Sequence, residues 1–427
     1  MTQQDAIPGG AGEAQDYPLS EVPPGARKSF GSLVVVLLGF TFFTATMFAG
    51  GQLGVAFPFW PDLAAIIVAG NLLLGLYVAV LGLIGQRTGL NTALLSRFSF
   101  GRIGARLPDA LLGFTQIGWY GWGTATMAVV LLRLLGVDAD ANPTLTYGLM
   151  IAFGMAFCWT AYIGYRGLEL LSLISVPLMV LLLAVSLWIA LGDAGGLQGL
   201  AAIQPTSSLG IGAAITIVFG TFVSGGTQAT NWTRFAATPG HAVWGALVAF
   251  FIGNGLMITT GAIGALVYQQ PDVVEVLVIQ GLTMLGIVML VLNLWTTQDN
   301  TIYNFSAVGC TALATDRRRM VTIVGAVIGT VLALLRIDLH LVPFLLLLGT
   351  FIPPIGGVIM ADYFFKRRGK YPAIQGADLP AFNVAGLAGY GGGCLVAYLT
   401  PGIPPLNGIF AAMVIYVLVD RALPKPG

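Results

Sequence analysis

The chain has 427 residues, of which 56% are hydrophobic and only 9% are charged. Soluble domains carry about 25% charged residues, so this sequence has too few charges to cover a water-exposed surface, and we expect it to lie in a lipid bilayer. The net charge is +1 and no extended basic patch stands out, so nothing indicates a nucleic-acid partner.

Residues 1–26 are polar and contain proline, glycine and acidic residues. No apolar stretch typical of a signal peptide precedes the first long hydrophobic segment. This composition predicts a disordered cytoplasmic tail over 1–26, because it offers little apolar surface to bury.

Twelve later segments are apolar and approach the roughly 20 residues that a helix needs to cross a bilayer. They are residues 32–56, 63–86, 107–135, 144–164, 168–191, 209–230, 242–268, 277–304, 320–335, 341–365, 381–399 and 405–423. The tenth is interrupted by Pro353 and Pro354. The sequence therefore predicts an all-α membrane protein with twelve transmembrane helices.

The positions of Lys and Arg orient these helices, because cytoplasmic loops are enriched in both residues. With the N-terminus placed inside, all 19 Lys and Arg residues except Arg133 and Arg336 fall on the cytoplasmic side. A single missing span would invert every later loop and destroy this partition. We therefore expect a multi-pass protein with both termini in the cytoplasm.

The first and sixth spans are interrupted by small and polar residues, over Gly39–Gly51 and Phe219–Gln228. Such segments allow a helix to unwind in mid-membrane, which is tolerated where the freed backbone lines a cavity. Two interruptions five spans apart are typical of an inverted-repeat transporter with its site near the midplane. Close helix packing through small residues is the alternative explanation.

The third span places Gln116 and Trp119 three residues apart, and therefore on one helix face. A glutamine amide both donates and accepts hydrogen bonds, so it can read the edge of a heterocycle. An indole offers a flat face for stacking, and Phe222 in the sixth span can supply the opposite face. Alternatively, Trp119 packs against lipid or at the membrane interface.

The eighth span carries Asn293, Thr296, Thr297 and Asn300 on one face. Hydroxyl and amide oxygens suit a hard cation such as Na⁺, and carbonyls freed in the first span can complete the site. Interhelical hydrogen bonding is the alternative. Asp299 is an ionisable residue inside a span, and a functional role and a structural role for it stay equally open.

The sequence offers no chemistry typical of an enzyme. Its three cysteines, Cys158, Cys310 and Cys394, lie far apart in apolar segments, and its two histidines are separated. No nucleophile constellation or nucleotide-binding glycine loop follows a predicted strand. A transporter is therefore expected, and an ion channel is the alternative from another class.

Several segments together resemble the bacterial cytosine permeases of the nucleobase–cation symporter family. The segments that carry the resemblance are Gly39–Gly51, Ser96–Gly101, Gln116–Tyr120, Thr221–Thr227, Asn293–Asn300 and Ile352–Tyr363. The likeness covers about residues 20–420. It implies a LeuT-type 5+5 inverted repeat in the inner membrane, with repeats over 27–191 and 205–370 and two extra helices over 381–424.

The resemblance also implies a function and a site. The implied function is import of cytosine with sodium by alternating access, with no oligomer required. Uracil, hydantoin, a purine or a hydroxymethylpyrimidine is the alternative substrate, and a proton the alternative ion. The implied substrate residues are Gln116, Trp119, Phe222, Ser224, Thr221, Phe43, Thr44 and Gln298, and the implied sodium ligands are Gly39, Phe42, Asn293, Thr296 and Thr297. The family pattern has Asn where Gln298 stands and Ser where Thr44 stands, which bears on the identity of the base.

Overall fold

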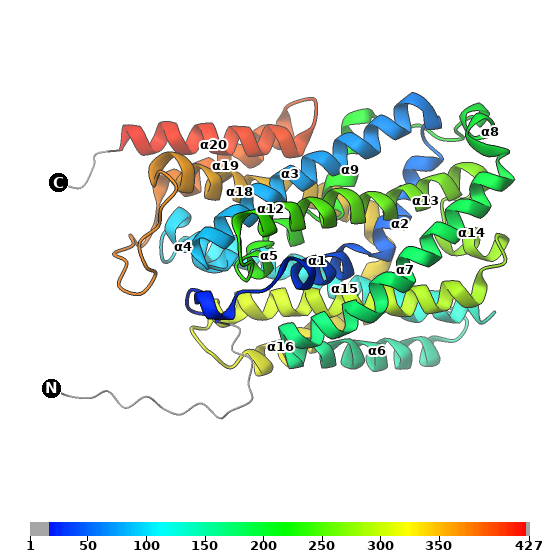
Figure 1. Ribbon diagram of the computed structural model, residues 1–427, viewed down its shortest axis with the longest axis horizontal. Coiled ribbons are helices and arrows are strands. Elements are labelled where there is room, and N and C mark those ends of the chain that lie inside the picture. The colour runs from blue at the N-terminus through cyan, green and yellow to red at the C-terminus, as the bar shows by residue number, and fades with distance from the viewer. Residues whose placement is uncertain (1–16, 424–427) are drawn as a thin grey trace.

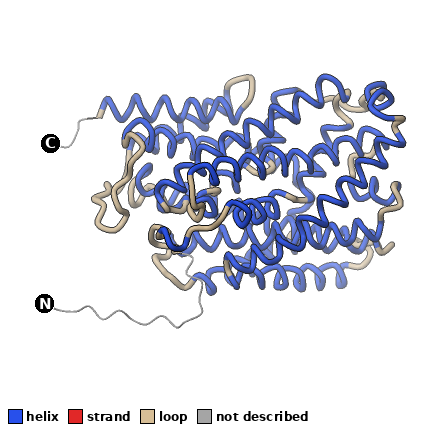
Figure 2. Tube along the Cα trace, viewed as in Figure 1, coloured by secondary structure: helices blue, strands red, loops and turns tan. Residues whose placement is uncertain are grey.

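The computed structural model describes residues 17–423, and these residues form helices joined by loops, with no strand among them (Figures 1 and 2). Many of the helices run roughly along the long axis of the molecule (Figure 1). In chain order the first half contains η1 (Pro24–Ala26), α1 (Phe30–Thr41), α2 (Thr44–Gly54), η2 (Phe59–Leu63), α3 (Ala64–Thr88), α4 (Thr92–Phe100), α5 (Arg106–Leu134), α6 (Pro143–Ile163), α7 (Tyr165–Asp193) and α8 (Gly196–Ala202). The second half contains α9 (Ile211–Gly220), α10 (Val223–Thr227), α11 (Thr230–Thr233), α12 (Pro239–Leu247), η3 (Val248–Gly253), α13 (Asn254–Tyr268), α14 (Val273–Ile279), α15 (Thr283–Ala312), α16 (Arg318–Leu334), η4 (Ile337–His340), α17 (Leu341–Phe351), α18 (Pro353–Ala361), η5 (Asp362–Lys366), α19 (Val384–Leu399) and α20 (Pro404–Ala422).

Within residues 17–423, six helical segments are long and apolar enough to cross a membrane. They are Phe59–Thr88, Pro143–Ile163, Tyr165–Asp193, Pro239–Tyr268, Ile337–Lys366 and Pro404–Ala422. The bent pair α1 and α2 makes a seventh when it is counted as one span. Each of the twelve predicted segments contains helix, but a count of twelve crossings goes beyond what length and composition establish.

Large apolar side chains on the outside of the bundle support a location in the membrane. Trp188 is 76% exposed and Trp159 is 67% exposed, and both belong to helices that pass the length and composition test. Exposed large apolar residues on this scale would be costly in water. In a bilayer these side chains face hydrocarbon. The apolar outer surface and the low charge content therefore both indicate that the protein lies in lipid.

Both predicted helix interruptions are present. The first helix ends at Thr41 and resumes at Thr44 with a bend of 56°. Between them Phe42 (φ −75°, ψ 91°) and Phe43 (φ −133°, ψ 128°) are extended. The sixth segment breaks at Phe222 (φ −130°, ψ 11°), between α9 and α10. The two breaks therefore free backbone groups in the interior of the bundle.

The expected disordered tail over 1–26 is wrong for residues 17–26, and residues 1–16 lie outside the described residues. Tyr17 O accepts a hydrogen bond from Arg234 Nη1 at 2.7 Å, and Pro18 O accepts one from Asn91 Nδ2 at 2.9 Å. Val22 is only 2% exposed. These contacts use the backbone of the segment, so a polar composition did not reveal them.

The eighth predicted span, 277–304, is displaced along the chain. The long helix α15 begins at Thr283 and continues to Ala312, while Val273–Ile279 forms the separate helix α14. The chain turns at Gly281, whose φ of 70° lies in the left-handed region that glycine adopts without strain. The sequence did not predict this turn, because the residues on both sides of it are apolar.

The last two helices pack closely on the tenth segment. A Cβ at Gly357 of α18 would lie 2.7 Å from Ile409 O of α20, and a Cβ at Gly389 of α19 would lie 2.9 Å from Ala412 O. Tyr416 of α20 also donates a 2.5 Å hydrogen bond to the buried Asp362. The pair α19 and α20 is therefore attached by close backbone approach and by a buried polar contact.

Candidate substrate and ion site

A small cavity lined by buried residues lies where the two broken helices meet α5 and α15. It is lined by Phe40, Phe43, Gln116, Trp119, Thr221, Phe222, Ser224, Gly225, Thr297 and Thr301. Its volume is about 10 Å³, roughly what a single water molecule needs. Six of the eight predicted substrate residues line it, and the exceptions are Thr44 and Gln298. In this conformation the lining side chains fill the space that a planar ring would take.

Aromatic side chains fill most of this space. The Phe43 ring lies 5.3 Å from the Trp119 ring at an interplanar angle of 77°, and 6.0 Å from the Phe222 ring at 69°. The Trp119 Nε1–H donates to Ser224 Oγ at 3.1 Å. All four residues are buried. Trp119 therefore sits inside the bundle, which contradicts a lipid-facing position, and its indole N–H is held by the broken sixth segment.

The Gln116 amide is a polar group without a partner. The residue is 1% exposed, and among the described residues neither its Nε2 nor its Oε1 has a hydrogen-bond partner. Leaving a buried polar group unsatisfied costs about 1–3 kcal/mol. Because Gln116 lines the cavity, a ligand with an adjacent donor and acceptor would remove this cost.

The remaining predicted substrate residues are placed differently. Thr221 Oγ1 donates to Val218 O at 2.7 Å within its own helix. Thr44 does not line the cavity, and its Oγ1 donates to Asn293 Oδ1 at 2.8 Å, which links α2 to α15. Gln298 packs against Gly123 of α5, where a Cβ would lie 1.7 Å from its Nε2. Gln298 is therefore accommodated by a glycine beside the cavity.

Two of the predicted ion ligands, Phe42 and Thr297, meet at the end of α1. Thr297 Oγ1 lies 3.1 Å from Phe42 O and 3.2 Å from Phe40 O. Thr296 Oγ1 lies 3.1 Å from Asn293 O. Neutral oxygens on a broken helix end suit a hard cation such as Na⁺. No group of three or more His, Cys, Asp or Glu residues that could hold a metal occurs within residues 17–423.

Gly39, the fifth predicted ligand, marks a close approach between α1 and α7. A Cβ at this position would lie 2.3 Å from Ser172 Oγ. Ser172 is fully buried, and its hydroxyl has no hydrogen-bond partner among the described residues. Sequence reasoning missed Ser172, the Phe40 carbonyl and Thr301. Only Thr301 carried a signal, because it lies four residues after Thr297 on the same face.

Asp299 and Asn300 belong to the surroundings of the cavity rather than to its lining. Asn300 accepts a hydrogen bond from Trp232 Nε1 at 3.0 Å, which links α15 to α11, and it donates to Thr296 O at 2.7 Å within α15. Asp299 is fully buried, with one oxygen 3.1 Å from Asn300 Nδ2. Its other oxygen has no partner within the described part of the chain. For Asn300 this supports the interhelical interpretation.

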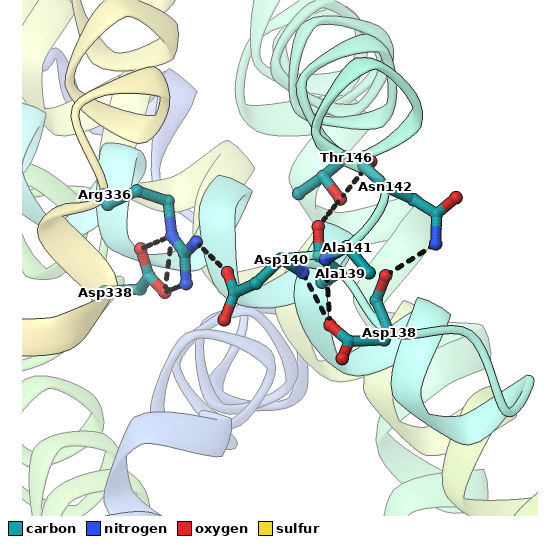
Figure 3. A network of polar contacts seen from close by, with 8 residues as sticks. All are labelled: Asp138, Ala139, Asp140, Ala141, Asn142, Thr146, Arg336 and Asp338. Atoms are coloured by element: carbon teal, nitrogen blue, oxygen red, sulfur yellow. Dashed lines mark hydrogen bonds and ion pairs between the residues drawn. The ribbon is translucent and has the colours of Figure 1, made fainter.

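A wide vestibule of about 770 Å³ opens on one side of the cavity. Both Arg133 and Arg336, the two cations predicted to lie outside, line it. Arg133 pairs with Asp272 at 2.5 Å. Arg336 pairs with Asp140 at 2.8 Å and Asp338 at 3.1 Å (Figure 3). The hydrogen bonds that Arg336 donates to Asp338 and Asp140 raise the pKa of its guanidinium, which therefore stays charged.

Aromatic residues separate the vestibule from the cavity. Trp122 lines the vestibule, and its ring lies 5.5 Å from that of Phe43, which lines the cavity. Phe48, which also lines the vestibule, contacts Trp122 at 6.3 Å. Phe43, in the extended break of the first helix, is thus positioned to close the cavity on the vestibule side.

On the other side of the cavity, toward the chain termini, polar contacts close the bundle. Thr92 and Thr230 join through their hydroxyl groups at 2.6 Å. Asn231 Nδ2 donates to Asn304 Oδ1 at 2.8 Å, and Arg234 holds the N-terminal segment. Hydrogen bonds therefore close the bundle on this side of the cavity, whereas aromatic rings close it on the vestibule side.

Comparison with known proteins identifies the family. The model of the permeases for cytosine/purines, uracil, thiamine and allantoin matches residues 21–375. The chain belongs to this family. It is 37% identical to the cytosine permease of Escherichia coli K12 over 412 residues, which is 96% of each chain. It is 24% identical to the allantoin permease of Bacillus subtilis, covering 88% of this chain and 86% of that one.

Solved structures show that this permease has the fold of Mhp1, a nucleobase-cation-symport-1 family transporter. The closed form of Mhp1 with bromovinylhydantoin bound matches with a TM-score of 0.81 at 18% identity, over 94% of each chain. The inward-facing form of Mhp1 matches with a TM-score of 0.79, over 94% of this chain and 92% of that one. The family expected from the sequence motifs is confirmed, and so is the all-helical fold. The named relatives are permeases and transporters.

Proposed function

We propose that this permease imports cytosine across the bacterial inner membrane together with sodium, by alternating access. The observation that carries the proposal is the unpartnered Gln116 amide, which lines a cavity together with Trp119 and Phe222. Cytosine presents neighbouring donors and acceptors on its edge and two flat faces. The amide would pair with that edge, and the two aromatic residues would stack on the faces.

The closed cavity defines what binding must change. A base cannot enter a volume of about 10 Å³, so the aromatic side chains have to separate. Phe43 has the freedom to do so, because it lies in the extended break between α1 and α2. The Trp119–Ser224 hydrogen bond would open at the same time. Ser224 would then be released toward the base, which fits its predicted role in substrate binding.

Sodium binding would occur at Phe42, Thr297 and the neighbouring oxygens of Gly39, Asn293 and Thr296. The supporting geometry is the contact of Thr297 Oγ1 with the Phe40 and Phe42 carbonyls. Because Phe43 follows Phe42 directly, an ion that fixes the Phe42 carbonyl would also fix the aromatic side chain that closes the cavity. This connection through one peptide unit would couple the ion to the base.

The topology we propose follows the predicted one. Twelve spans would comprise repeats over 27–191 and 205–370 and a final pair over 381–424, with both termini in the cytoplasm. The vestibule then faces outward, and its lining carries more carboxylates than guanidinium groups. That excess attracts cations. A monovalent cation moving inward gains about 2.3 kcal/mol per 100 mV, which can drive accumulation of a neutral base.

Uptake of radiolabelled cytosine, with Na⁺ present and then replaced by choline, tests the proposal. Saturable uptake that falls without Na⁺ is expected. The variant Trp119→Ala should abolish base binding, while Trp188→Ala, a control at a residue that is 76% exposed, should leave it unchanged. Uptake of uracil or hydantoin without cytosine would move the substrate assignment to another heterocycle. Equal uptake in choline would refute sodium coupling.

A further inference from the structure

A groove of about 420 Å³ opens on the outside of the bundle, between α5, α15 and α16 and away from the substrate cavity. Its walls are mostly apolar and include Phe114, Phe305, Val308, Met320 and Val324. Phe114 is 62% exposed and Met320 is 50% exposed. In a membrane protein such residues face hydrocarbon, so the groove is open to the lipid.

Two glycines line the groove, and their surroundings differ. A Cβ at Gly113 of α5 would meet nothing closer than Val308 Cγ1 at 3.6 Å, which is ordinary van der Waals contact. A Cβ at Gly309 of α15 would lie 2.5 Å from Val321 Cγ1, so α15 and α16 approach closely there. The groove therefore has free space beside Gly113, and its wall is tightly packed at Gly309.

One end of the groove carries a basic and an acidic residue, Arg106 and Asp109, in the first turn of α5. They lie three residues apart and therefore on the same helix face. Arg106 is exposed, whereas Asp109 is only 5% exposed. Asp109 Oδ1 has no hydrogen-bond partner among the described residues. The nearby Arg97 donates to Thr311 O at 3.1 Å. A buried acceptor thus faces the groove beside an exposed cation.

We propose that this groove binds one phosphatidylethanolamine molecule. An acyl chain would lie along the apolar walls past Gly113. The phosphate would pair with the Arg106 guanidinium, and the primary ammonium would donate to the unpartnered oxygen of Asp109. This charge order matches a zwitterionic headgroup that has N–H donors. Phosphatidylcholine has the same charges but no N–H to donate, and phosphatidylglycerol has no cation.

Native mass spectrometry of the purified protein tests this site. The protein is equilibrated with equal amounts of the three lipids carrying identical acyl chains. We expect phosphatidylethanolamine to be retained over phosphatidylcholine by roughly tenfold, the ratio that one charge-assisted hydrogen bond provides. Stepwise N-methylation of the headgroup should reduce retention by the wild-type protein, with the main loss at the fully methylated lipid. Equal retention of all headgroups would overturn the proposal.

Variants assign the retained lipid to this groove. Asp109→Asn, which keeps an acceptor oxygen but no charge, should weaken the preference for the ethanolamine headgroup. Gly113→Leu should abolish retention by filling the groove. The pair Arg166 and Glu169, at the same spacing near the start of α7, provides the control. Glu169→Gln should change nothing. If Asp109→Asn does not fold, Gly113→Leu and the methylation series still test the proposal. Headgroup selectivity that survives Gly113→Leu would show that the lipid binds elsewhere.

Discussion

The variant Gln116→Leu distinguishes two roles of the Gln116 amide, which are binding of a ligand and stabilisation of the fold. Leucine has a similar volume and no polar atoms. In the ligand-free protein the Gln116 amide has no partner within the described residues, so its removal eliminates an unsatisfied group and should leave the melting temperature unchanged or raise it. A glutamine with a structural role would behave in the opposite way.

The effect on binding can be worked from the same geometry. Cytosine would make two hydrogen bonds with the amide, each worth about 1 kcal/mol net. Losing both costs about 2 kcal/mol, which raises the Kd for cytosine roughly 30-fold. Equilibrium binding of radiolabelled cytosine to the purified protein measures this change, and a thermal melt of the same sample without ligand measures stability.

Gln280 provides the matched control. Its Oε1 accepts a hydrogen bond from Ser186 Oγ at 2.8 Å, and its Nε2 donates to Ser186 O at 3.0 Å. Gln280→Leu should therefore lower the melting temperature and leave cytosine affinity unchanged. If Gln116→Leu instead lowered the melting temperature while keeping wild-type affinity, the assignment of Gln116 as the base-reading residue would be refuted.

Three further predictions concern the ion, the vestibule and the last helix. Thr297→Ala should raise the Na⁺ concentration needed for half-maximal uptake by about tenfold, whereas Thr297→Ser, which keeps the hydroxyl, should not. If uptake by Thr297→Ala and by the wild-type protein depended equally on Na⁺ concentration, Thr297 would not be an ion ligand. Arg133→Asp or Asp272→Arg should each change uptake only a few-fold, because the two side chains are 45% and 27% exposed. The double reversal should restore wild-type uptake. A double-mutant cycle that shows no coupling energy would mean that the two residues do not form an ion pair. Tyr416→Phe should destabilise the protein by about 1–3 kcal/mol, because the buried Asp362 carboxylate loses a hydrogen-bond donor. Tyr398→Phe, at a residue that is 70% exposed, should leave the melting temperature unchanged. Equal melting temperatures for the two variants would contradict a structural role of the Tyr416 hydroxyl.

The parts of the site that sequence reasoning predicted depend on side-chain chemistry and helical spacing. Gln116 and Trp119 were found because two unusual residues share a face in the third span. The helix breaks around Phe43 and Phe222 were found because glycine and small hydroxyl residues cluster there. In each case the residue type itself carries the property that the structure uses.

The parts that were missed depend on the backbone or on packing between distant segments. The Phe40 carbonyl is available to Thr297 because α1 ends at Thr41, and any residue at position 40 would supply it. Ser172 became relevant only because α7 packs against Gly39. The direction of Gln298 was set by Gly123 on another helix. No local pattern contains this information.

The contacts of residues 17–22 also constrain how the protein is made. Tyr17 binds Arg234, which lies 217 positions later, and Glu21 accepts a hydrogen bond from the Ile374 N–H, 353 positions later. A chain emerging from the ribosome exposes this segment first. Asn91, which binds Pro18, follows early, whereas Arg234 and Ile374 are synthesised much later. The partners of this segment therefore become available in steps, first Asn91, then Arg234 and last Ile374. The contact between Glu21 and Ile374 is the last of these that synthesis permits, and a chain truncated before Ile374 cannot make it.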